Sequence, residues 1–247
     1  MRGFFLFWSF REGVSGPQWK TISKQRLRLC SYFLLKELMP KKWRPSAWVE
    51  RFVQRVGGSG CERPDLRHLL EKEKFPDECQ NFLNKENLQY LCVMPSSKWS
   101  GKNWPVESYL TLIKKLPYFP VILGTEKDAQ SKLLCDKLQS LGIPHFNGVG
   151  KWNLGQTCHV LKNSSGYLGG DTGLAHLAES IGIPARVIFG PTTPDMGFKP
   201  WRNESRTFGL SLWCRPCGKD GRICLRLTQK YMCLKDLTPE NILNNWR

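Results

Sequence analysis

Residues 166–190 read GYLGGDTGLAHLAESIGIPARVIFG. The apolar stretches 166–169 and 186–189 predict two short strands, and the segment 172–181 between them predicts a helix. Both strands are apolar on their two faces, which is typical of a parallel sheet that helices cover on each side. This unit therefore indicates an α/β protein with a doubly wound parallel sheet.

The same alternation of strands and helices precedes this unit along the chain. Further strands are expected at residues 88–94, 120–123 and 144–148. Further helices are expected at residues 105–116, 127–141, 154–163 and, after the unit, 239–246, where Thr238 is a suitable N-cap. Together these elements predict one Rossmann-like domain over residues 88–247.

Residues 1–87 follow a different pattern. Two basic amphipathic helices are expected at 19–39 and 48–56, followed by the glycine-rich linker 57–60. No stretch rich in valine or isoleucine precedes them that would predict a strand. We therefore expect residues 1–87 to form a mainly helical N-terminal part, too incomplete to make a second Rossmann-like domain.

The chain is strongly basic. Its 247 residues include 37 lysines and arginines against 21 aspartates and glutamates, a formal net charge of +16. Residues 1–60 carry 12 of the basic and 3 of the acidic side chains. Such a positive field attracts nucleic acid, anionic lipid head groups or phosphorylated substrates. A basic surface that only maintains solubility is the remaining alternative.

Composition and hydropathy exclude several classes of protein. Apolar residues make up 40% of the chain, aromatic residues 12% and charged residues 23%, so a collagen, coiled-coil or low-complexity protein is excluded. The apolar run at residues 4–10 is far too short to span a bilayer, and it lacks the cleavage site of a signal peptide. We therefore expect a cytoplasmic protein.

Polar loops follow three of the expected strands. They contain serines and two lysines at residues 95–105, a Gly-Thr-Glu turn at 124–126, and two glycines before an aspartate at 169–176. Ligands of such sheets bind beyond the carboxyl ends of the strands, where the amides at a helix start favour a phosphate. Two phosphate-type loops at one sheet edge indicate a diphosphate ligand.

Each candidate residue also has a structural interpretation, as a helix cap, a core side chain or a solvated charge. Asp171 and Thr172 could be helix caps, and His176 could be a core side chain. Lys102 could be a solvated surface charge, and Glu126 the first acidic residue of the next helix. Their joint occurrence, in order and at the same sheet edge, favours the functional interpretation.

Four motifs carry a resemblance to one family. They are Lys102-x-Trp104-Pro105, Gly124-x-Glu126, Asp171-Thr172-Gly173-x-x-His176-x-Ala178 and Phe189-Gly190-Pro191-Thr192-x-Pro194. In this order they resemble the lipopolysaccharide heptosyltransferases, glycosyltransferase family 9, over residues 88–247. The resemblance implies a two-domain GT-B architecture, a C-terminal domain that binds ADP-heptose, and inverting transfer of heptose to the lipopolysaccharide core.

The resemblance also implies roles for individual residues. Lys102 would contact the donor phosphates, with Ser97 and Lys98 beside it in the same loop, and Glu126 would meet the ribose of the nucleotide. The residues that hold the diphosphate at the helix start would be Asp171, Thr172, Gly173 and His176. The lysine and the helix amides would stabilise the departing ADP, a scheme that requires no metal or other cofactor.

Partners and a location follow from the same resemblance. The acceptor would be the phosphate-bearing lipid A–core glycolipid, and the basic helices of residues 1–87 would lie on the anionic inner-membrane surface. The protein would then be cytoplasmic and peripheral to the inner membrane. Nucleic acid is not expected as a partner, because no nucleic-acid-binding pattern is present in the sequence.

The chain also departs from the family pattern. Relatives usually begin with a strand and a Gly-Asp loop, whose aspartate is the proposed base for the acceptor hydroxyl, and the sequence shows neither. We therefore expect residues 1–87 to be the remnant of an acceptor-side domain. The chain would then be an N-terminally shortened heptosyltransferase without an assigned catalytic base, impaired in transfer. The alternatives are a non-catalytic nucleotide or nucleotide-sugar binding protein and a transferase for another nucleotide sugar.

Ten cysteines are present, and in a cytoplasmic protein most of them should be reduced. Four form the cluster Cys214-x2-Cys217-x6-Cys224-x8-Cys233 near the C-terminus. The alternatives for this cluster are a structural zinc or another metal, a disulfide, and free thiols.

Overall fold

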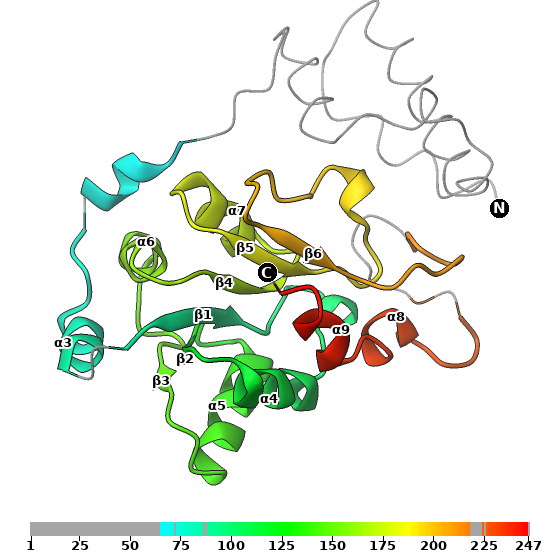
Figure 1. The fold of residues 1–247 in the computed structure, drawn as a ribbon, viewed down its shortest axis with the longest axis horizontal. Helices are drawn as coiled ribbons and strands as arrows, with labels where there is room; N and C mark the ends of the chain where they lie inside the picture. The colour runs from blue at the N-terminus through cyan, green and yellow to red at the C-terminus, as the bar shows by residue number, and fades with distance from the viewer. Residues whose placement is uncertain (1–64, 72, 86–87, 218–223, 225, 247) are drawn as a thin grey trace, which may run out of the picture. The chain divides into compact units, whose positions relative to one another are not determined.

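The computed structural model describes residues 65–71, 73–85, 88–217, 224 and 226–246. Their centre is a six-stranded parallel sheet with the strand order β3-β2-β1-β4-β5-β6 (Figure 1). The strands are β1 (Tyr90–Met94), β2 (Phe119–Ile122), β3 (Phe146–Asn147), β4 (Tyr167–Gly170), β5 (Ala185–Ile188) and β6 (Arg206–Phe208). The order runs outward in both directions from the neighbours β1 and β4, which makes the sheet doubly wound and Rossmann-like.

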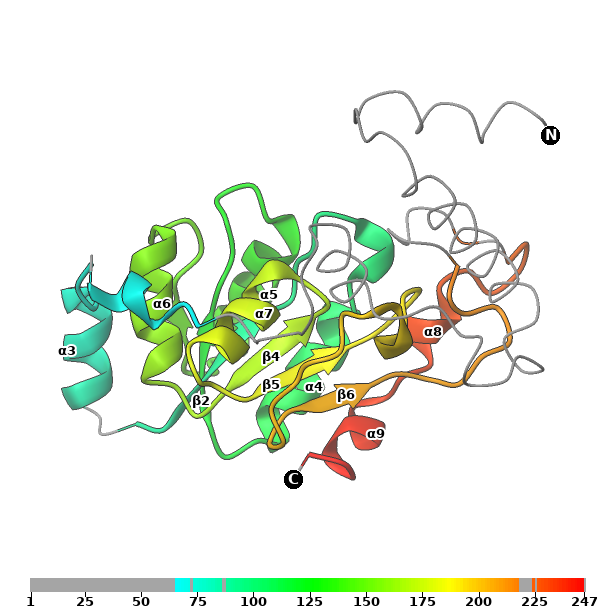
Figure 2. The same cartoon turned by 90° about the horizontal axis from the view of Figure 1, so that it is seen from above.

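Helices cover both faces of the sheet (Figure 1 and Figure 2). One face is covered by α4 (Val106–Lys115), α5 (Ala129–Ser140), α8 (Met232–Lys235) and α9 (Pro239–Leu243). The other face is covered by α3 (Asp77–Lys85), α6 (Leu154–Lys162) and α7 (Gly173–Ser180). The described 3₁₀ turns are η2 (Arg67–Glu71), η3 (Ser100–Lys102) and η4 (Pro194–Met196).

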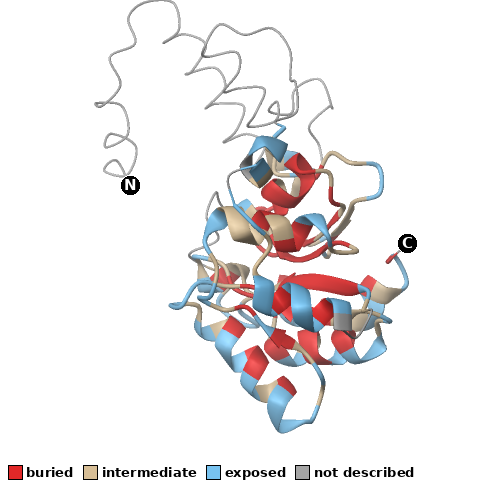
Figure 3. Ribbon diagram, turned by 90° about the vertical axis from the view of Figure 1, so that its left-hand side faces the viewer, coloured by how far each residue is buried: buried red, intermediate tan, exposed pale blue. Residues whose placement is uncertain are grey.

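The central strands are buried between the two helix layers (Figure 3). All residues of β4 are buried, and β1 is buried except at Met94. Helices on both faces exclude water from the strands, so side chains of either orientation must be apolar. This explains why the strands show continuous apolar runs and no alternation in the sequence.

The predicted fold class is confirmed. The strands and helices predicted between residues 88 and 189 begin and end within two residues of the observed elements. The last helix ends at Leu243, short of the predicted residue 246, although Trp246 is buried and its ring stacks on Phe208 with centroids 6.5 Å apart.

Three helices or strands of the described chain, α3, β6 and α8, were not predicted. β6 has only three residues, and it becomes a strand by pairing with β5, where Thr207 lies beside Val187. A stretch this short has no periodicity of its own, so only its neighbour defines it. α3 lies on the sheet face of α6 and α7, where its Cys79 and Leu83 are buried.

Residues 65–85 belong to the same compact unit as the sheet. The backbone N–H of Leu66, for example, donates to the carbonyl of Ser180 at the end of α7, with an N–O distance of 3.2 Å. The boundary predicted between residues 87 and 88 therefore falls inside this compact unit. The acceptor-side origin of residues 1–87 stays a prediction, and the helices and linker predicted within residues 1–60 lie outside the described residues.

Within the described ranges, none of the helices combines the length and apolar character needed to cross a bilayer.

Candidate functional site

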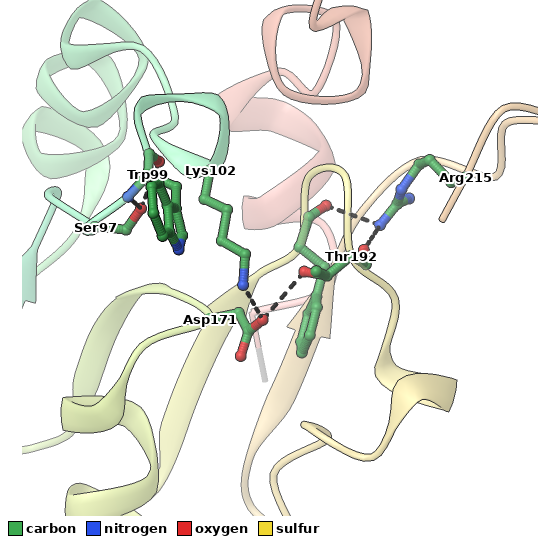
Figure 4. A network of polar contacts seen from close by, with 7 residues as sticks. Ser97, Trp99, Lys102, Asp171, Thr192 and Arg215 are labelled. Atoms are coloured by element: carbon green, nitrogen blue, oxygen red, sulfur yellow. Dashed lines mark hydrogen bonds and ion pairs between the residues drawn. The ribbon is translucent and has the colours of Figure 1, made fainter. Parts of the chain in front are cut away.

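Three loops meet at the carboxyl edge of the sheet, one after each of the neighbouring strands β1, β4 and β5. The first contributes Lys102, the second Asp171 and the third Thr192, and their side chains converge (Figure 4). β1 and β4 flank the point where the strand order reverses, which is where doubly wound sheets bind their ligands. The two loops thus lie at the same sheet edge, as expected, while the phosphate-binding roles of Lys102 and Asp171 stay predictions.

The Asp171 carboxylate is the centre of this contact. Its Oδ2 accepts a hydrogen bond from Lys102 Nζ at 2.9 Å and another from Thr192 Oγ1 at 3.1 Å. The Lys102 and Asp171 side chains are 12% and 6% exposed, and Thr192 is fully buried. Solvent screens a buried ion pair weakly, so the attraction between the two side chains is strong. Asp171 therefore holds the Lys102 ammonium group in place at the sheet edge.

Arg215 fixes the loop that carries Thr192. Its Nη2 donates to the carbonyl of Thr192 at 2.8 Å (Figure 4) and to that of Phe189 at 3.0 Å. Its Nη1 donates to the carbonyl of Leu210. The residue is buried, and this burial lowers the pKa of Arg215, although nearby cysteine side chains oppose the shift. A guanidinium stays protonated even so. Arg215 thus ties the loop after β5 to the segment after β6.

The N-terminus of α7 is open. Thr172 occupies the N-cap position, but its side chain caps no backbone N–H, since its Oγ1 instead bonds to the Tyr167 hydroxyl at 2.9 Å. Gly173 is exposed, and a Cβ added to it would meet no atom within 4 Å. The first N–H groups of a helix have no partner within the helix and carry a partial positive charge, so an anion can bind here beside Lys102.

His176 lies one turn further along α7, and its ring lies near two aromatic rings. Its ring is parallel to that of Trp201 at a centroid distance of 6.3 Å and lies 6.4 Å from that of Phe198. Burial lowers the pKa of His176, Lys102 lowers it further, and the carboxylates of Asp171 and Glu179 oppose both effects. At neutral pH the imidazole is therefore neutral, and can give or accept one hydrogen bond.

The other predicted residues do not converge on the Lys102–Asp171 pair through their side chains. Ser97 organises its own loop, because its hydroxyl donates to the carbonyl of Trp99 at 2.7 Å. Lys98 is exposed and its Nζ lies 5.4 Å from the centre of the Trp99 ring. Glu126 is exposed in the loop after β2 and forms no hydrogen bond or ion pair with a described residue. Their predicted roles remain predictions.

Two residues of the site were not predicted. Thr192 stands in the Phe-Gly-Pro-Thr motif, so the sequence contained a signal for its loop, although not for its contact with Asp171. Arg215 lies in the cysteine segment and is separated from Thr192 by 23 positions in the sequence. Nothing local to Arg215 indicates that its guanidinium faces the sheet edge.

The described residues of the cysteine cluster do not have the geometry of a metal site. Cys217 Sγ donates to the carbonyl of Cys214 at 3.1 Å, and Cys224 Sγ accepts from the backbone N–H of Tyr231 at 3.3 Å. Among the residues that the structure describes, no group of three or more His, Cys, Asp or Glu side chains is placed to hold a metal ion. Burial raises the pKa of Cys233 to about 11, which disfavours the thiolate that a metal requires.

The hydroxyl of Thr192 can be tested by an isosteric change. We expect Thr192→Val to lower the free energy of unfolding by about 1 kcal/mol, because Asp171 loses a buried hydrogen bond. The melting temperature should fall by about 2–4 °C. Thr193→Val is the matched control, since Thr193 Oγ1 is buried without a hydrogen-bond partner among the described residues. An equal loss of stability in both variants would contradict the assigned role of Thr192.

A doubly wound parallel sheet whose phosphate-type loops meet at the reversal of strand order defines a nucleotide-binding type of domain. Comparison with known proteins narrows this class. The family model described as glycosyltransferase family 9 (heptosyltransferase) matches residues 20–226, so the chain belongs to this family.

Individual relatives agree with this assignment. Lipopolysaccharide heptosyltransferase 1 of Pseudomonas aeruginosa is 23% identical over 257 residues, covering 87% of the chain and 68% of the relative. The structure of E. coli ADP-heptose lps heptosyltransferase II matches with a TM-score of 0.54 and 20% identity, over 70% of the chain and 51% of that structure. E. coli heptosyltransferase WaaC with ADP matches with a TM-score of 0.53 and 17% identity, over 80% and 53% respectively.

The chain thus spans about half the length of these two solved structures. At such identities the structural likeness concerns the fold alone.

Proposed function

We propose that this chain binds the diphosphate of a nucleotide sugar at the carboxyl edge of its sheet and acts as the donor-binding part of a heptosyltransferase. The observation that carries the proposal is the buried Lys102–Asp171 pair beside the open N-terminus of α7. A cation and unpartnered helix amides at one edge are suited to two adjacent phosphates. The donor would be ADP-heptose, in keeping with the names of the similar proteins.

The reaction would depend on charge developing on the departing ADP. As the bond between sugar and phosphate breaks, negative charge grows on the diphosphate, and Lys102 and the amides of α7 would stabilise it. Lys102 would share its hydrogen bonds between Asp171 and the phosphates, with Asp171 directing the ammonium group. The neutral imidazole of His176 would contribute a hydrogen bond to the diphosphate. The described residues thus supply the donor side of an inverting transfer of heptose.

The lipopolysaccharide core would be the acceptor. Residues 1–60, with 12 basic and 3 acidic side chains, have the charge expected of a segment that meets an anionic glycolipid at the cytoplasmic face of the inner membrane. The structural zinc predicted at the cysteines also stays a proposal, which the described thiol contacts do not favour. Elemental analysis of the purified chain decides it, because one metal per chain would require the thiols to rearrange into ligands.

Calorimetric titration of the purified chain tests the proposed donor. We expect ADP and ADP-heptose to bind at one site, and ADP to be released when ADP-heptose is supplied with deacylated lipopolysaccharide core. Binding without release of ADP would favour a non-catalytic nucleotide-sugar binding protein. Tighter binding of a UDP sugar would favour a transferase for another donor, and no binding of any nucleotide would refute the proposed function.

A further inference from the structure

Glu179 is a buried acidic residue on α7 that the proposed donor chemistry does not use. It follows His176 by three positions, so the two side chains share one face of the helix. Glu179 is only 2% exposed. Its carboxylate accepts hydrogen bonds from the backbone N–H of Trp201, from the backbone N–H of Arg202 at 3.2 Å, and from the hydroxyl of Ser205.

These bonds fasten residues 201–205 to the rest of the unit at two places. One place is α7, through Glu179 itself. The other is β5, because Ser205 Oγ accepts a hydrogen bond from the backbone N–H of Ala185 at 2.8 Å. The three donors that converge on one carboxylate set the position of this segment relative to α7.

The fastened segment carries part of the aromatic wall around His176. The Trp201 ring lies at 4° to the imidazole plane, and Phe198, just before the segment, contacts both His176 and Lys102. Lys102 Nζ lies 5.9 Å from the centre of the Phe198 ring. A shift of residues 201–205 would therefore change the packing of His176 at the edge where the diphosphate is proposed to bind.

We propose that Glu179 is a positioning residue of the donor site: by holding residues 201–205 on α7, it keeps Trp201 against His176 and fixes the imidazole beside the open helix N-terminus. This inference rests on the proposed function, since it concerns the affinity of the same site. A carboxylate suits the role because its two oxygens accept several hydrogen bonds at once. A glutamine would turn an NH₂ group toward a donor.

The charged groups near His176 provide a specific signature for this role. Asp171 and Glu179 raise the pKa of His176, whereas Lys102 and burial lower it. Replacing Glu179 by glutamine removes one of the two groups that raise the pKa. The imidazole should then titrate at a lower pH than in the unchanged protein, an effect that loss of stability alone does not produce.

The test uses the full chain with Glu179→Gln. We expect the Kd for ADP, measured by calorimetry, to rise about tenfold. Nuclear magnetic resonance should show a lower pKa for His176 and altered signals of the Trp201 indole. Glu204→Gln is the matched control, because Glu204 is exposed on the same segment and lies 3.8 Å from Arg202 Nε in a peripheral ion pair. This control should change neither ADP affinity nor the titration of His176.

Ser205→Ala keeps the charge of Glu179 and removes one of its donors, so it tests the proposal even if Glu179→Gln does not fold. We expect it to weaken ADP binding in the same direction, by a smaller factor. The proposal is overturned if the folded variants lose thermal stability while ADP affinity and the His176 titration stay unchanged. If the unchanged protein binds no ADP, the proposed function fails, and the His176 and Trp201 signals alone decide the role of Glu179.

Discussion

Lys102→Ala should weaken the binding of ADP about 100-fold, a loss of about 2.7 kcal/mol. The Lys102 side chain is only 12% exposed in its pair with Asp171, so its hydrogen bonds to an anion act where water screens them weakly. The same change leaves the Asp171 carboxylate buried, with the Thr192 hydroxyl as its one remaining side-chain donor among the described residues. We therefore also expect the free energy of unfolding to fall by about 3 kcal/mol.

A second substitution separates these two effects. Lys102→Ala combined with Asp171→Asn removes the unpaired buried charge, so most of the stability should return while ADP affinity stays low. Lys114→Ala is the control for charge alone, because Lys114 is exposed in the last turn of α4, and it should change ADP affinity less than about twofold. Restored ADP binding in the double variant would mean that Lys102 only neutralises Asp171, contrary to its proposed role.

Gly169→Ala should destabilise the sheet at the site by about 3 kcal/mol, which corresponds to a fall in melting temperature of about 6–12 °C. A Cβ at this position would lie 2.6 Å from the carbonyl oxygen of Met94, which is backbone of the paired strand β1 and cannot rotate away. It would also collide with the Tyr167 hydroxyl, which bonds to Thr172 at the start of α7.

The neighbouring glycine offers a matched control on the same strand. A Cβ added to Gly170 would approach no atom more closely than 3.5 Å, so Gly170→Ala should change the melting temperature by no more than about 2 °C. Thermal unfolding of the two variants under identical conditions measures the difference. Equal stability would show that β1 and β4 separate easily at Gly169, against the close strand contact described above.

Much of the fold could be predicted because it depends on short-range patterns. Buried strands such as β1 and β4 are continuous apolar runs, and the intervening helices are amphipathic over several turns. Elements without such a pattern escaped prediction. β6 has three residues and owes its conformation to its pairing with β5, while α3 belongs to a segment that was assigned to the N-terminal part.

The site was predictable in its loops and less so in its contacts. The positions of Lys102 and Asp171 after two expected strands indicated that both lie at the carboxyl edge, and the structure joins them across 69 positions. The side chains of Ser97, Lys98 and Glu126 lie in expected loops but are directed by local contacts or by solvent. Side-chain direction within a loop depends on turn geometry, which residue identity alone does not define.

The sequence by itself determined the class of fold, the basic charge and the loops in which a phosphate would bind, because periodicity, charge and turn-forming residues are local properties of the chain. Only the tertiary structure decided that Thr192 and Arg215 support Asp171, and that Glu179 holds the segment carrying Trp201. These contacts join residues 21 to 23 positions apart, after different strands. They exist because the strand order and the helix layers bring those loops together, and that order results from packing over the whole unit.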